Sequence, residues 1–231
     1  MADITIKGPD GSMSAYLALP KDRARAPGVL VIQEIFGVNK VMRDLADGFA
    51  AQGYVALCPD LFWRQQPGIQ LTDQSEAEWQ RAFQLYQGFN EAKGVGDLIV
   101  SLEHLRGLPQ CSGKVGCVGY CLGGKLAYLM ATRSNADASV GYYGVGIEKA
   151  LGEAAAITRP LLLHIAAKDK FCPPEAQAEI TSSLARNSHV TLHSYPGVDH
   201  AFARVGGEHY DKSAADLANR RTADFFKKHL G

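Results

Sequence analysis

The sequence predicts an α/β fold with a mostly parallel central sheet and helices on both of its faces. Short, nearly continuous apolar runs such as residues 28–34 and 54–58 have the composition of strands buried on both faces. Segments with helical spacing of apolar residues lie between such runs, and this alternation is typical of parallel sheets. Because 231 residues suit one α/β domain with a full core, we expect a single domain over residues 1–231.

The first half of the chain begins with a predicted antiparallel hairpin. Residues 2–7 and 13–19 alternate between apolar and polar positions, and the Pro-Asp-Gly sequence at residues 9–11 supplies the turn. A charged loop over residues 20–27 then leads into the strand over residues 28–34. The elements expected next are a helix over 38–52, a strand over 54–58, an irregular segment over 61–71 and helices over 73–90 and 94–105.

The segment over residues 61–90 has two interpretations. Its helix carries the aromatic residues Trp79, Phe83, Tyr86 and Phe89. An aromatic-rich segment between core strands can cover a pocket, or it can be an ordinary packed helix, and the sequence leaves both open.

The second half of the chain continues the alternation. An apolar run with Val115 and Val118 predicts a strand, and the spacing of Leu126, Leu129 and Met130 predicts a helix directly after it. The remaining elements follow in chain order: strands over 137–143, 160–166 and 189–195, and helices over 174–187 and 211–230.

The turn between that strand and helix carries Cys121. Residues 119–123 place a cysteine at the centre of the pattern Gly-x-Ser-x-Gly, in which a sharp turn presents a nucleophile. Gly119 and Gly123 avoid a collision in so tight a turn. We expect Cys121 to be exposed at the helix N-terminus, where the helix dipole favours a thiolate. Taken alone, the pattern also fits a buried cysteine in any α/β protein.

Three further polar residues, Glu34, Asp169 and His200, lie at the C-terminal ends of predicted strands, where parallel sheets gather functional groups. The chain order of nucleophile, acid and histidine is that of α/β-hydrolases. In this interpretation Cys121 attacks an acyl carbon as thiolate, His200 moves the proton and activates water, and Asp169 orients the imidazole. The backbone N–H groups of Leu122 and Ile35 are expected to hold the oxyanion. Each side chain alone also fits a surface or capping role, but their joint order favours catalysis.

The composition excludes several classes of partner. Lys plus Arg and Asp plus Glu both number 24, so the formal net charge is zero, which argues against nucleic acid or an anionic membrane. We see no signal peptide and no membrane span. Five cysteines without paired spacing fit a reducing, cytoplasmic location. Without Cys-x-x-Cys or His-Glu-x-x-His, we expect no metal site.

Six sequence blocks resemble the dienelactone hydrolase family, and the resemblance covers nearly the whole chain. The blocks are residues 33–39, 58–61, 94–98, 118–124, 141–146 and 200–204. The resemblance implies an α/β-hydrolase fold and carboxymethylenebutenolidase activity, the hydrolysis of an enol-lactone to maleylacetate in the catabolism of chlorinated aromatics. It also implies no cofactor and a monomer.

The resemblance implies roles for named residues. Cys121, His200 and Asp169 correspond to the family's catalytic triad. Glu34 corresponds to a carboxylate that pairs with the resting thiol and takes its proton when substrate arrives, which protects the thiol from oxidation. Phe36 is expected in the substrate pocket.

Substrate binding is where the sequence departs from the family. Arg204 matches one of two arginines that grip the substrate carboxylate, but Trp79 stands in place of the other. Arg81 lies two residues further on, more than half a helical turn away. Phe83 replaces an expected tyrosine and Ala201 an expected serine.

All three departures make the pocket more apolar. The loss of a bidentate guanidinium also weakens binding of a substrate carboxylate. We therefore hypothesise a substrate that is less acidic or more apolar than dienelactone. Tyr142, in the block over residues 141–146, is a further expected substrate contact.

Three readings of the function stay open at this point. The first is a thiol hydrolase of esters or lactones with a small-molecule substrate. The second is a non-catalytic small-molecule binding protein on the same scaffold. The third is a redox-sensing thiol protein, for which the sequence offers no obvious resolving cysteine near Cys121.

Overall fold

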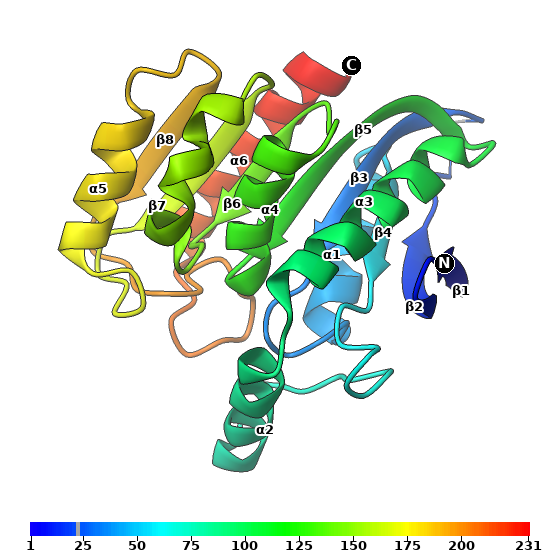
Figure 1. Ribbon diagram of the computed structural model, residues 1–231, viewed down its shortest axis with the longest axis horizontal. Helices are drawn as coiled ribbons and strands as arrows, with labels where there is room; N and C mark the ends of the chain where they lie inside the picture. Colours follow the sequence, from blue (N-terminus) through cyan, green and yellow to red (C-terminus); the bar gives the residue numbers. More distant parts are fainter. Residues whose placement is uncertain (22–23) are drawn as a thin grey trace. The chain divides into compact units, whose positions relative to one another are not determined.

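The computed structural model describes residues 1–21 and 24–231, and its strands form one eight-stranded sheet (Figure 1). The strands are β1 (Ala2–Gly8), β2 (Gly11–Ala18), β3 (Ala26–Ile32), β4 (Val55–Pro59), β5 (Cys111–Tyr120), β6 (Ser139–Tyr142), β7 (Leu161–Ala166) and β8 (Val190–Tyr195). Their order in the sheet is β1-β2-β4-β3-β5-β6-β7-β8.

Strand direction follows the pattern expected from the sequence. β1 and β2 form an antiparallel hairpin, and β2 pairs antiparallel with β4. The pairs β3–β4, β5–β6, β6–β7 and β7–β8 are parallel. The predicted fold class, a mostly parallel sheet with an N-terminal antiparallel hairpin, is therefore confirmed. The expected loop over 20–27 includes Asp22 and Arg23, which lie outside the described residues, and β3 already begins at Ala26.

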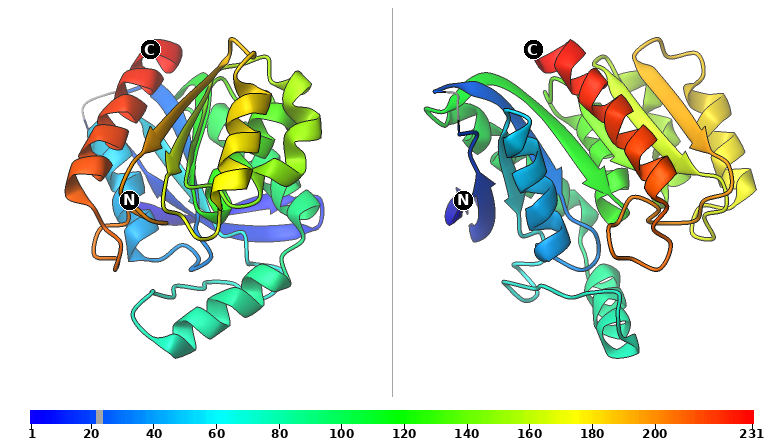
Figure 2. Two further views of the ribbon diagram at one scale, coloured as in Figure 1. Left: turned by 90° about the vertical axis from the view of Figure 1, so that its left-hand side faces the viewer. Right: turned by 180° about the vertical axis from the view of Figure 1, so that it is seen from behind.

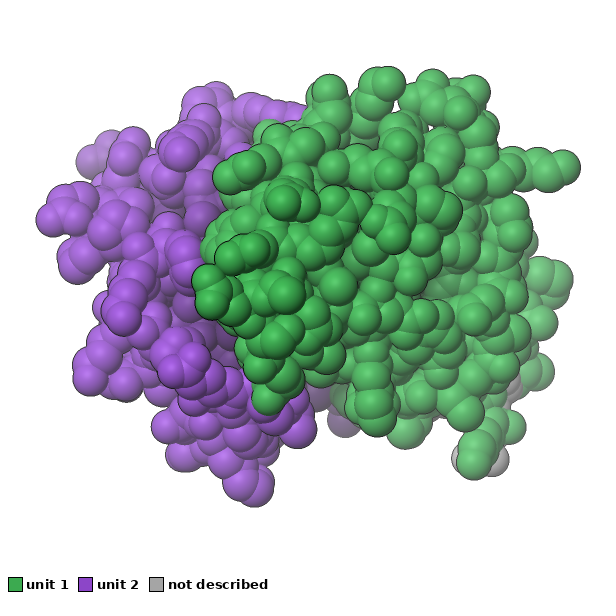
Figure 3. Space-filling view, turned by 90° about the horizontal axis from the view of Figure 1, so that it is seen from below, with its two compact units in different colours: residues 1–116 green, residues 117–231 purple. Residues whose placement is uncertain are grey.

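The chain comprises two compact units, residues 1–116 and residues 117–231 (Figure 3). The first unit contains the helices α1 (Lys40–Ala51), α2 (Glu76–Gln87) and α3 (Glu91–Gly107). Within this unit α1 and α3 lie on opposite faces of the strands, and α2 extends away from them (Figures 1 and 2). The expectation of a single domain over residues 1–231 stays a prediction.

The helices of the first unit begin where a side chain caps them. Ser75 accepts a hydrogen bond from the N–H of Glu78, so α2 begins at Glu76 rather than at residue 73. Asn90 caps α3 in the same way, so that helix begins before the predicted residue 94. Both caps satisfy N–H groups that the helix itself leaves without acceptors.

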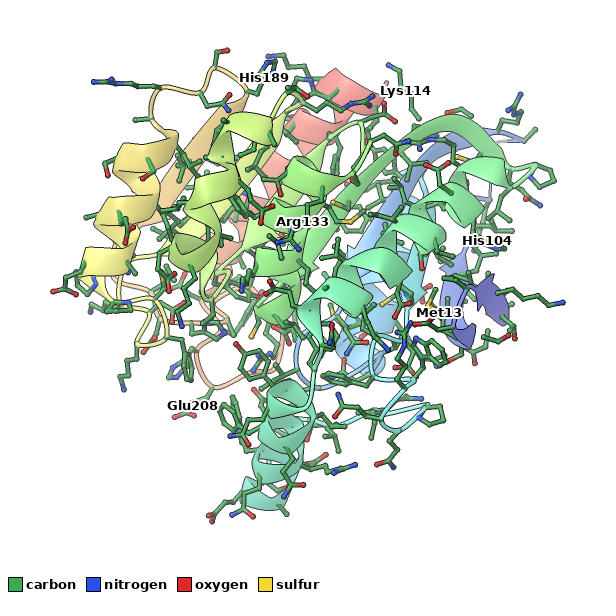
Figure 4. All side chains as sticks on the ribbon, viewed as in Figure 1. Met13, His104, Lys114, Arg133, His189 and Glu208 are labelled. Atoms are coloured by element: carbon green, nitrogen blue, oxygen red, sulfur yellow. The ribbon has the colours of Figure 1, made fainter. Side chains whose placement is uncertain are left out.

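The second unit contains α4 (Leu122–Arg133), α5 (Pro174–Leu184), α6 (Lys212–Leu230) and a 3₁₀ segment, η1 (Ile147–Ala156). In this unit α4 and α5 cover one face of the strands and α6 covers the other (Figures 1 and 2). No pattern in the sequence predicts η1, in which only Ile147 is buried. Glu153 of η1 forms an ion pair with Arg133 in the last turn of α4, and Arg133 is labelled in Figure 4.

Glycines bring the start of α4 unusually close to β6. A Cβ atom on Gly124 would lie 2.3 Å from the carbonyl oxygen of Tyr142, and one on Gly144 would lie 2.7 Å from the backbone nitrogen of Lys125. Real side chains cannot make such contacts, so only glycine fits at these positions. This close approach sets where α4 begins, directly after Cys121.

Candidate active site

Cys121 occupies a strained turn between β5 and α4. Its φ is 55° and its ψ is −115°, a left-handed conformation that is uncommon for residues other than glycine. Such strain is typical of functional sites, where the surrounding structure holds it in place. The carbonyl oxygen of Cys121 accepts hydrogen bonds from the N–H groups of Gly124 at 2.9 Å and Lys125 at 3.3 Å, which form the first turn of α4.

The expectation that Cys121 is exposed was wrong, since only 8% of the residue is exposed. The sequence pattern shows that a turn presents this side chain, but it does not show which residues pack around the turn. Leu122, one of the two expected oxyanion donors, is buried at the first position of α4. Its N–H therefore lies at the positive end of the helix dipole.

His200 and Asp169 come together from two different loops of the second unit. Nδ1 of His200 lies 2.7 Å from Oδ2 of Asp169, and both residues are buried. The other carboxylate oxygen, Oδ1, accepts the backbone N–H of Phe171 at 2.8 Å. Asp169 is thus held in place by its own loop and can orient the imidazole, the role that the sequence analysis assigned to it.

The environment of His200 favours its protonated form. Burial by itself lowers the pKa of this imidazole, because a low dielectric disfavours charge. Electrostatic interactions with Cys121 and Asp169, together with side-chain hydrogen bonds to both residues, outweigh burial and raise the pKa of His200 from 6.5 to about 10. The contacts with Cys121 and Asp169 therefore favour a protonated imidazole.

Two aromatic rings contact the imidazole. Tyr143 and Phe171 form T-shaped contacts with His200, with centroid distances of 5.2 Å and 5.0 Å. Tyr143 follows β6 directly and has a φ of 37°, and Ala201 has a φ of 62°. Two more residues beside the site thus have left-handed backbones, although neither is a glycine.

The expected residues Glu34, Ile35 and Phe36 are buried and belong to the segment over residues 33–39, which follows β3. Hydrogen bonds from residues 60–71 hold residues 33–39 in place within the first unit. Specifically, Gln33 Oε1 accepts the N–H of Leu61 at 2.9 Å, Asn39 Nδ2 donates to the carbonyl of Leu71 at 2.8 Å, and the N–H of Leu71 donates to the carbonyl of Phe36 at 2.9 Å.

Asp60 in turn holds the irregular segment, a role that the sequence analysis missed. Its carboxylate accepts the N–H of Phe62 at 2.9 Å and that of Gly68 at 2.8 Å. Burial raises the pKa of Asp60, and the two backbone hydrogen bonds oppose that rise. An aspartate two residues before a turn N–H is a common turn signal, but the contact with Gly68 could not be predicted from local pattern.

The aromatic residues of α2 form a cluster with Phe36. Trp79 packs edge-on against Phe36 at 4.9 Å between centroids, and Phe83 stacks on Trp79 at 5.5 Å. Arg81 is held elsewhere, because its guanidinium donates to Oε1 of Gln66 at 2.5 Å and Oε1 of Gln84 at 3.2 Å. The helix therefore presents an aromatic face, and its arginine is engaged by glutamines.

Arg204 and Tyr142, two further residues expected to contact the substrate, have different surroundings in the structure. Arg204 is buried, and its backbone N–H closes a turn on the carbonyl of Ala201 at 2.9 Å. Tyr142 has no exposed surface, and its hydroxyl is bound by Thr222 at 2.6 Å and Asn219 at 3.0 Å. A side-chain contact with substrate, which the sequence analysis expected of Tyr142, does not match this placement.

Some features of the chain bear on other kinds of site. Within residues 1–21 and 24–231, no helix is long and apolar enough to cross a membrane. The described His, Cys, Asp and Glu side chains form no group suited to a metal ion. All five cysteines are described, buried and outside any disulfide.

Comparison with known proteins identifies the family. The sequence profile of the dienelactone hydrolase family matches residues 13–230. This chain belongs to the dienelactone hydrolase family. It is 53% identical to a putative carboxymethylenebutenolidase of Azospirillum brasilense, with all of both chains covered. It is 42% identical to a carboxymethylenebutenolidase of Pseudomonas putida, over 96% of this chain and 94% of that protein.

A solved structure agrees with this membership. The putative dienelactone hydrolase of Klebsiella pneumoniae matches with a TM-score of 0.88 and 26% identity, over 98% of both chains. Dienelactone hydrolases cleave a lactone ester bond, so the protein is a hydrolase acting on ester or lactone bonds.

Proposed function

We propose that this protein hydrolyses enol-lactones of the dienelactone type through a thioester formed on Cys121. The observation that carries the proposal is the hydrogen-bonded series of Cys121, His200 and Asp169 at a strained strand-to-helix turn. A nucleophile, a base and a group that orients the base are the parts that covalent acyl transfer needs.

The first half of the reaction opens the lactone. The Cys121 thiolate attacks the carbonyl carbon and forms a C–S bond, while the π electrons of the carbonyl move to its oxygen. When this oxyanion collapses, the ring C–O bond breaks. The enol oxygen leaves with the proton of the His200 imidazolium, and the released enol tautomerises to a ketone.

The second half releases the acid. Neutral His200 takes a proton from water, whose oxygen attacks the thioester carbon. Collapse of this second oxyanion breaks the C–S bond and restores the thiolate beside an imidazolium. The net change is one water consumed, with a carboxylic acid and a ketone formed.

The N–H groups of Leu122 and Ile35 are proposed as the oxyanion donors in both halves. Removal of one such donor in a hydrolase costs about 3–4 kcal/mol of transition-state stabilisation. Glu34 is proposed to take the proton of the resting Cys121 thiol when substrate arrives. The proposal also includes a cytoplasmic monomer without a cofactor, which gel filtration and assay of chelator-treated enzyme would test.

A second candidate is a lactonase or carboxylesterase for a less acidic, more apolar substrate. The cluster of Phe36, Trp79 and Phe83 favours it, because an apolar surface replaces a carboxylate-binding arginine. Arg204 remains as the one arginine that matches the family's carboxylate ligands. The two candidates share the same chemistry and differ only in the group that flanks the reacting carbonyl.

The test is ultraviolet-monitored hydrolysis of cis- and trans-dienelactone beside a neutral aryl ester. We expect Cys121→Ala to abolish turnover of every substrate that the parent protein cleaves. Cys111→Ala, which removes a different buried thiol, that of the first residue of β5, is the matched control and should retain activity. Fast loss of dienelactone supports the first candidate, and ester turnover alone supports the second.

Two results would contradict catalysis by this thiol. Undiminished turnover by Cys121→Ala would exclude it as the nucleophile. Ligand binding without turnover of any ester or lactone would favour a binding protein on this scaffold.

A further inference from the structure

We propose that Thr222 and His164 are positioning residues for the reaction of Cys121. Neither residue was singled out by the sequence analysis, and neither belongs to the series that ends on Asp169. The inference rests on the proposed function, because it assigns to a buried hydrogen-bond chain the task of holding the groups that carry out the chemistry.

This chain of hydrogen bonds between side chains crosses the three neighbouring strands β6, β7 and β8 and reaches α6. His164 on β7 is 1% exposed, and its Nδ1 lies 2.8 Å from the hydroxyl of Tyr195 on β8. Its Nε2 lies 3.0 Å from Oγ1 of Thr222 on α6. The same Oγ1 lies 2.6 Å from the hydroxyl of Tyr142 on β6. One threonine of the helix therefore joins two strands directly and a third through His164.

The protons in this chain run in one direction. Tyr142 donates its hydroxyl proton to Oδ1 of Asn219 at 3.0 Å. Since each hydroxyl has one proton, Thr222 donates to Tyr142 and accepts from Nε2–H of His164. The unprotonated Nδ1 then accepts the proton of Tyr195, whose oxygen is also bonded to Arg221.

The surroundings of His164 agree with this neutral tautomer. Burial, together with the nearby charges of His193 and Arg221, lowers its pKa from 6.5 to about 3. A neutral imidazole can accept at one nitrogen and donate at the other, as the chain requires. Buried polar networks that are fully satisfied in this way specify a unique packing.

Each strand residue of the chain also holds a catalytic segment through its backbone. The N–H of Cys121 donates to the carbonyl of Tyr142 at 3.1 Å, and the N–H of Tyr143 donates to the carbonyl of His164 at 2.8 Å. The ring of Tyr143 in turn contacts the imidazole of His200.

Tyr195 on β8 also holds a catalytic segment through its backbone. The N–H of Ala167, two residues before Asp169, donates to the carbonyl of Tyr195 at 3.1 Å. Side chains that lie on the α6 side of the strands thus set the relative positions of backbones that carry the nucleophile, the acid and a ring against the histidine.

This arrangement predicts an effect on turnover rather than on substrate binding. A misplacement of reacting groups by about 1 Å costs roughly a hundredfold in rate, while a residue that never touches substrate leaves KM nearly unchanged. Breaking the hydrogen-bond chain at Thr222 removes a side chain that bonds to both Tyr142 and His164.

The experiment compares Thr222→Val with Thr222→Ser. Valine keeps the shape and loses the hydroxyl, while serine restores the hydroxyl and loses a methyl. Ser139→Ala is the matched control, because it removes a different buried hydroxyl, which lies on β6 and is bonded to Cys117 at 3.3 Å. For each variant, kcat and KM are measured on a substrate that the parent cleaves, with stability by urea unfolding.

The rate at which iodoacetamide alkylates Cys121 is the second measurement, with the site identified by mass spectrometry. It needs no substrate, so it tests positioning even where the proposed substrate is wrong, and Cys121→Ala tests the proposed function separately. Burial raises the pKa of the thiols of Cys117 and Cys172 to about 12, so their alkylation by iodoacetamide is slow.

We expect Thr222→Val to lower kcat by tenfold or more with KM within about twofold of the parent, and to slow alkylation by a similar factor. Thr222→Ser should have a kcat and an alkylation rate within about threefold of those of the parent, and Ser139→Ala should keep both at the parent's values. The inference is overturned where Thr222→Val loses stability but keeps both rates. It is equally overturned where serine fails to restore them, or where Ser139→Ala loses them to the same extent.

Discussion

A Cβ atom placed on Gly119 would lie 1.8 Å from the carbonyl oxygen of Gly123. The two glycines stand two residues before and two residues after Cys121, and their backbones nearly touch where β5 turns into α4. No side chain fits between them, and the contacting atoms are backbone, so neither partner can give way. The strained conformation of Cys121 depends on this contact.

Replacement of Gly119 by alanine is therefore expected to destroy the turn. We expect Gly119→Ala to lose at least about 3 kcal/mol of unfolding free energy and more than a hundredfold in kcat, since a displaced nucleophile misses the carbonyl carbon. Urea unfolding and turnover of the parent's substrate measure the two effects. Gly96→Ala is the control, because a Cβ there meets no atom within 4 Å and alanine favours the helix by about 1 kcal/mol. Equal stability and activity of the two variants would contradict the strained turn.

The turn around Cys121 was predictable because its causes are local. A glycine at each end of five residues, between an apolar run and a helical pattern, leaves few conformations open. The order of Asp169 and His200 was equally accessible, since parallel strands place their carboxyl ends at one edge of a sheet. The structure brings these two side chains within 2.7 Å, as that argument predicts.

Other features depend on partners that are distant in the chain, so no local pattern reveals them. Gln33 meets the backbone of Leu61, 28 residues away, and Thr222 meets the hydroxyl of Tyr142, 80 residues away. The burial of Cys121 has the same origin, because it depends on what packs around the turn. The segment η1 was missed because its short 3₁₀ turns bury a single residue and leave no periodic signal.

Asp169→Asn is expected to reduce turnover while leaving the fold intact. The asparagine has the same shape but can offer an N–H to His200, which favours the wrong tautomer, and such a change in a comparable triad lowers kcat by about 10⁴. Asp199→Asn is the matched control, because Asp199 accepts the backbone N–H of His200 at 2.7 Å, which an amide oxygen can still do. Turnover from pH 6 to 9 measures both variants. Equal losses in the two would show that Asp169 acts through loop structure alone.

Trp79→Arg is expected to shift the substrate preference toward acidic lactones. A hydrogen bond to a charged group contributes about 1.5–3 kcal/mol, roughly a tenfold to hundredfold effect. We therefore expect the ratio of kcat/KM for dienelactone to that for a neutral aryl ester to rise at least tenfold. Arg81→Gln is the control and should change the ratio by less than about twofold, because Gln66 and Gln84 hold Arg81. An unchanged ratio in Trp79→Arg would show that this position does not meet the substrate's charged end.

The protonation of His164 predicts how stability depends on pH. Its pKa is lowered from 6.5 to about 3 by burial and by the charges of His193 and Arg221. Between these two pH values the unfolded chain binds a proton at this residue and the folded chain does not, so unfolding is favoured as the pH falls. Integration of this proton uptake from pH 7 to pH 5 gives a loss of about 2 kcal/mol in the free energy of unfolding.

The measurement is urea unfolding at pH 7 and pH 5 for the parent and for His164→Gln. The variant starts less stable, because it disturbs the hydrogen-bond chain, but it lacks the titrating group, so its loss on acidification should be smaller than that of the parent by about 2 kcal/mol. His189→Gln removes an exposed histidine and should show the same loss as the parent. If His164→Gln and the parent lost equal stability, the imidazole would be protonated in the folded protein, and the proton order from Tyr195 to Asn219 would have to run differently.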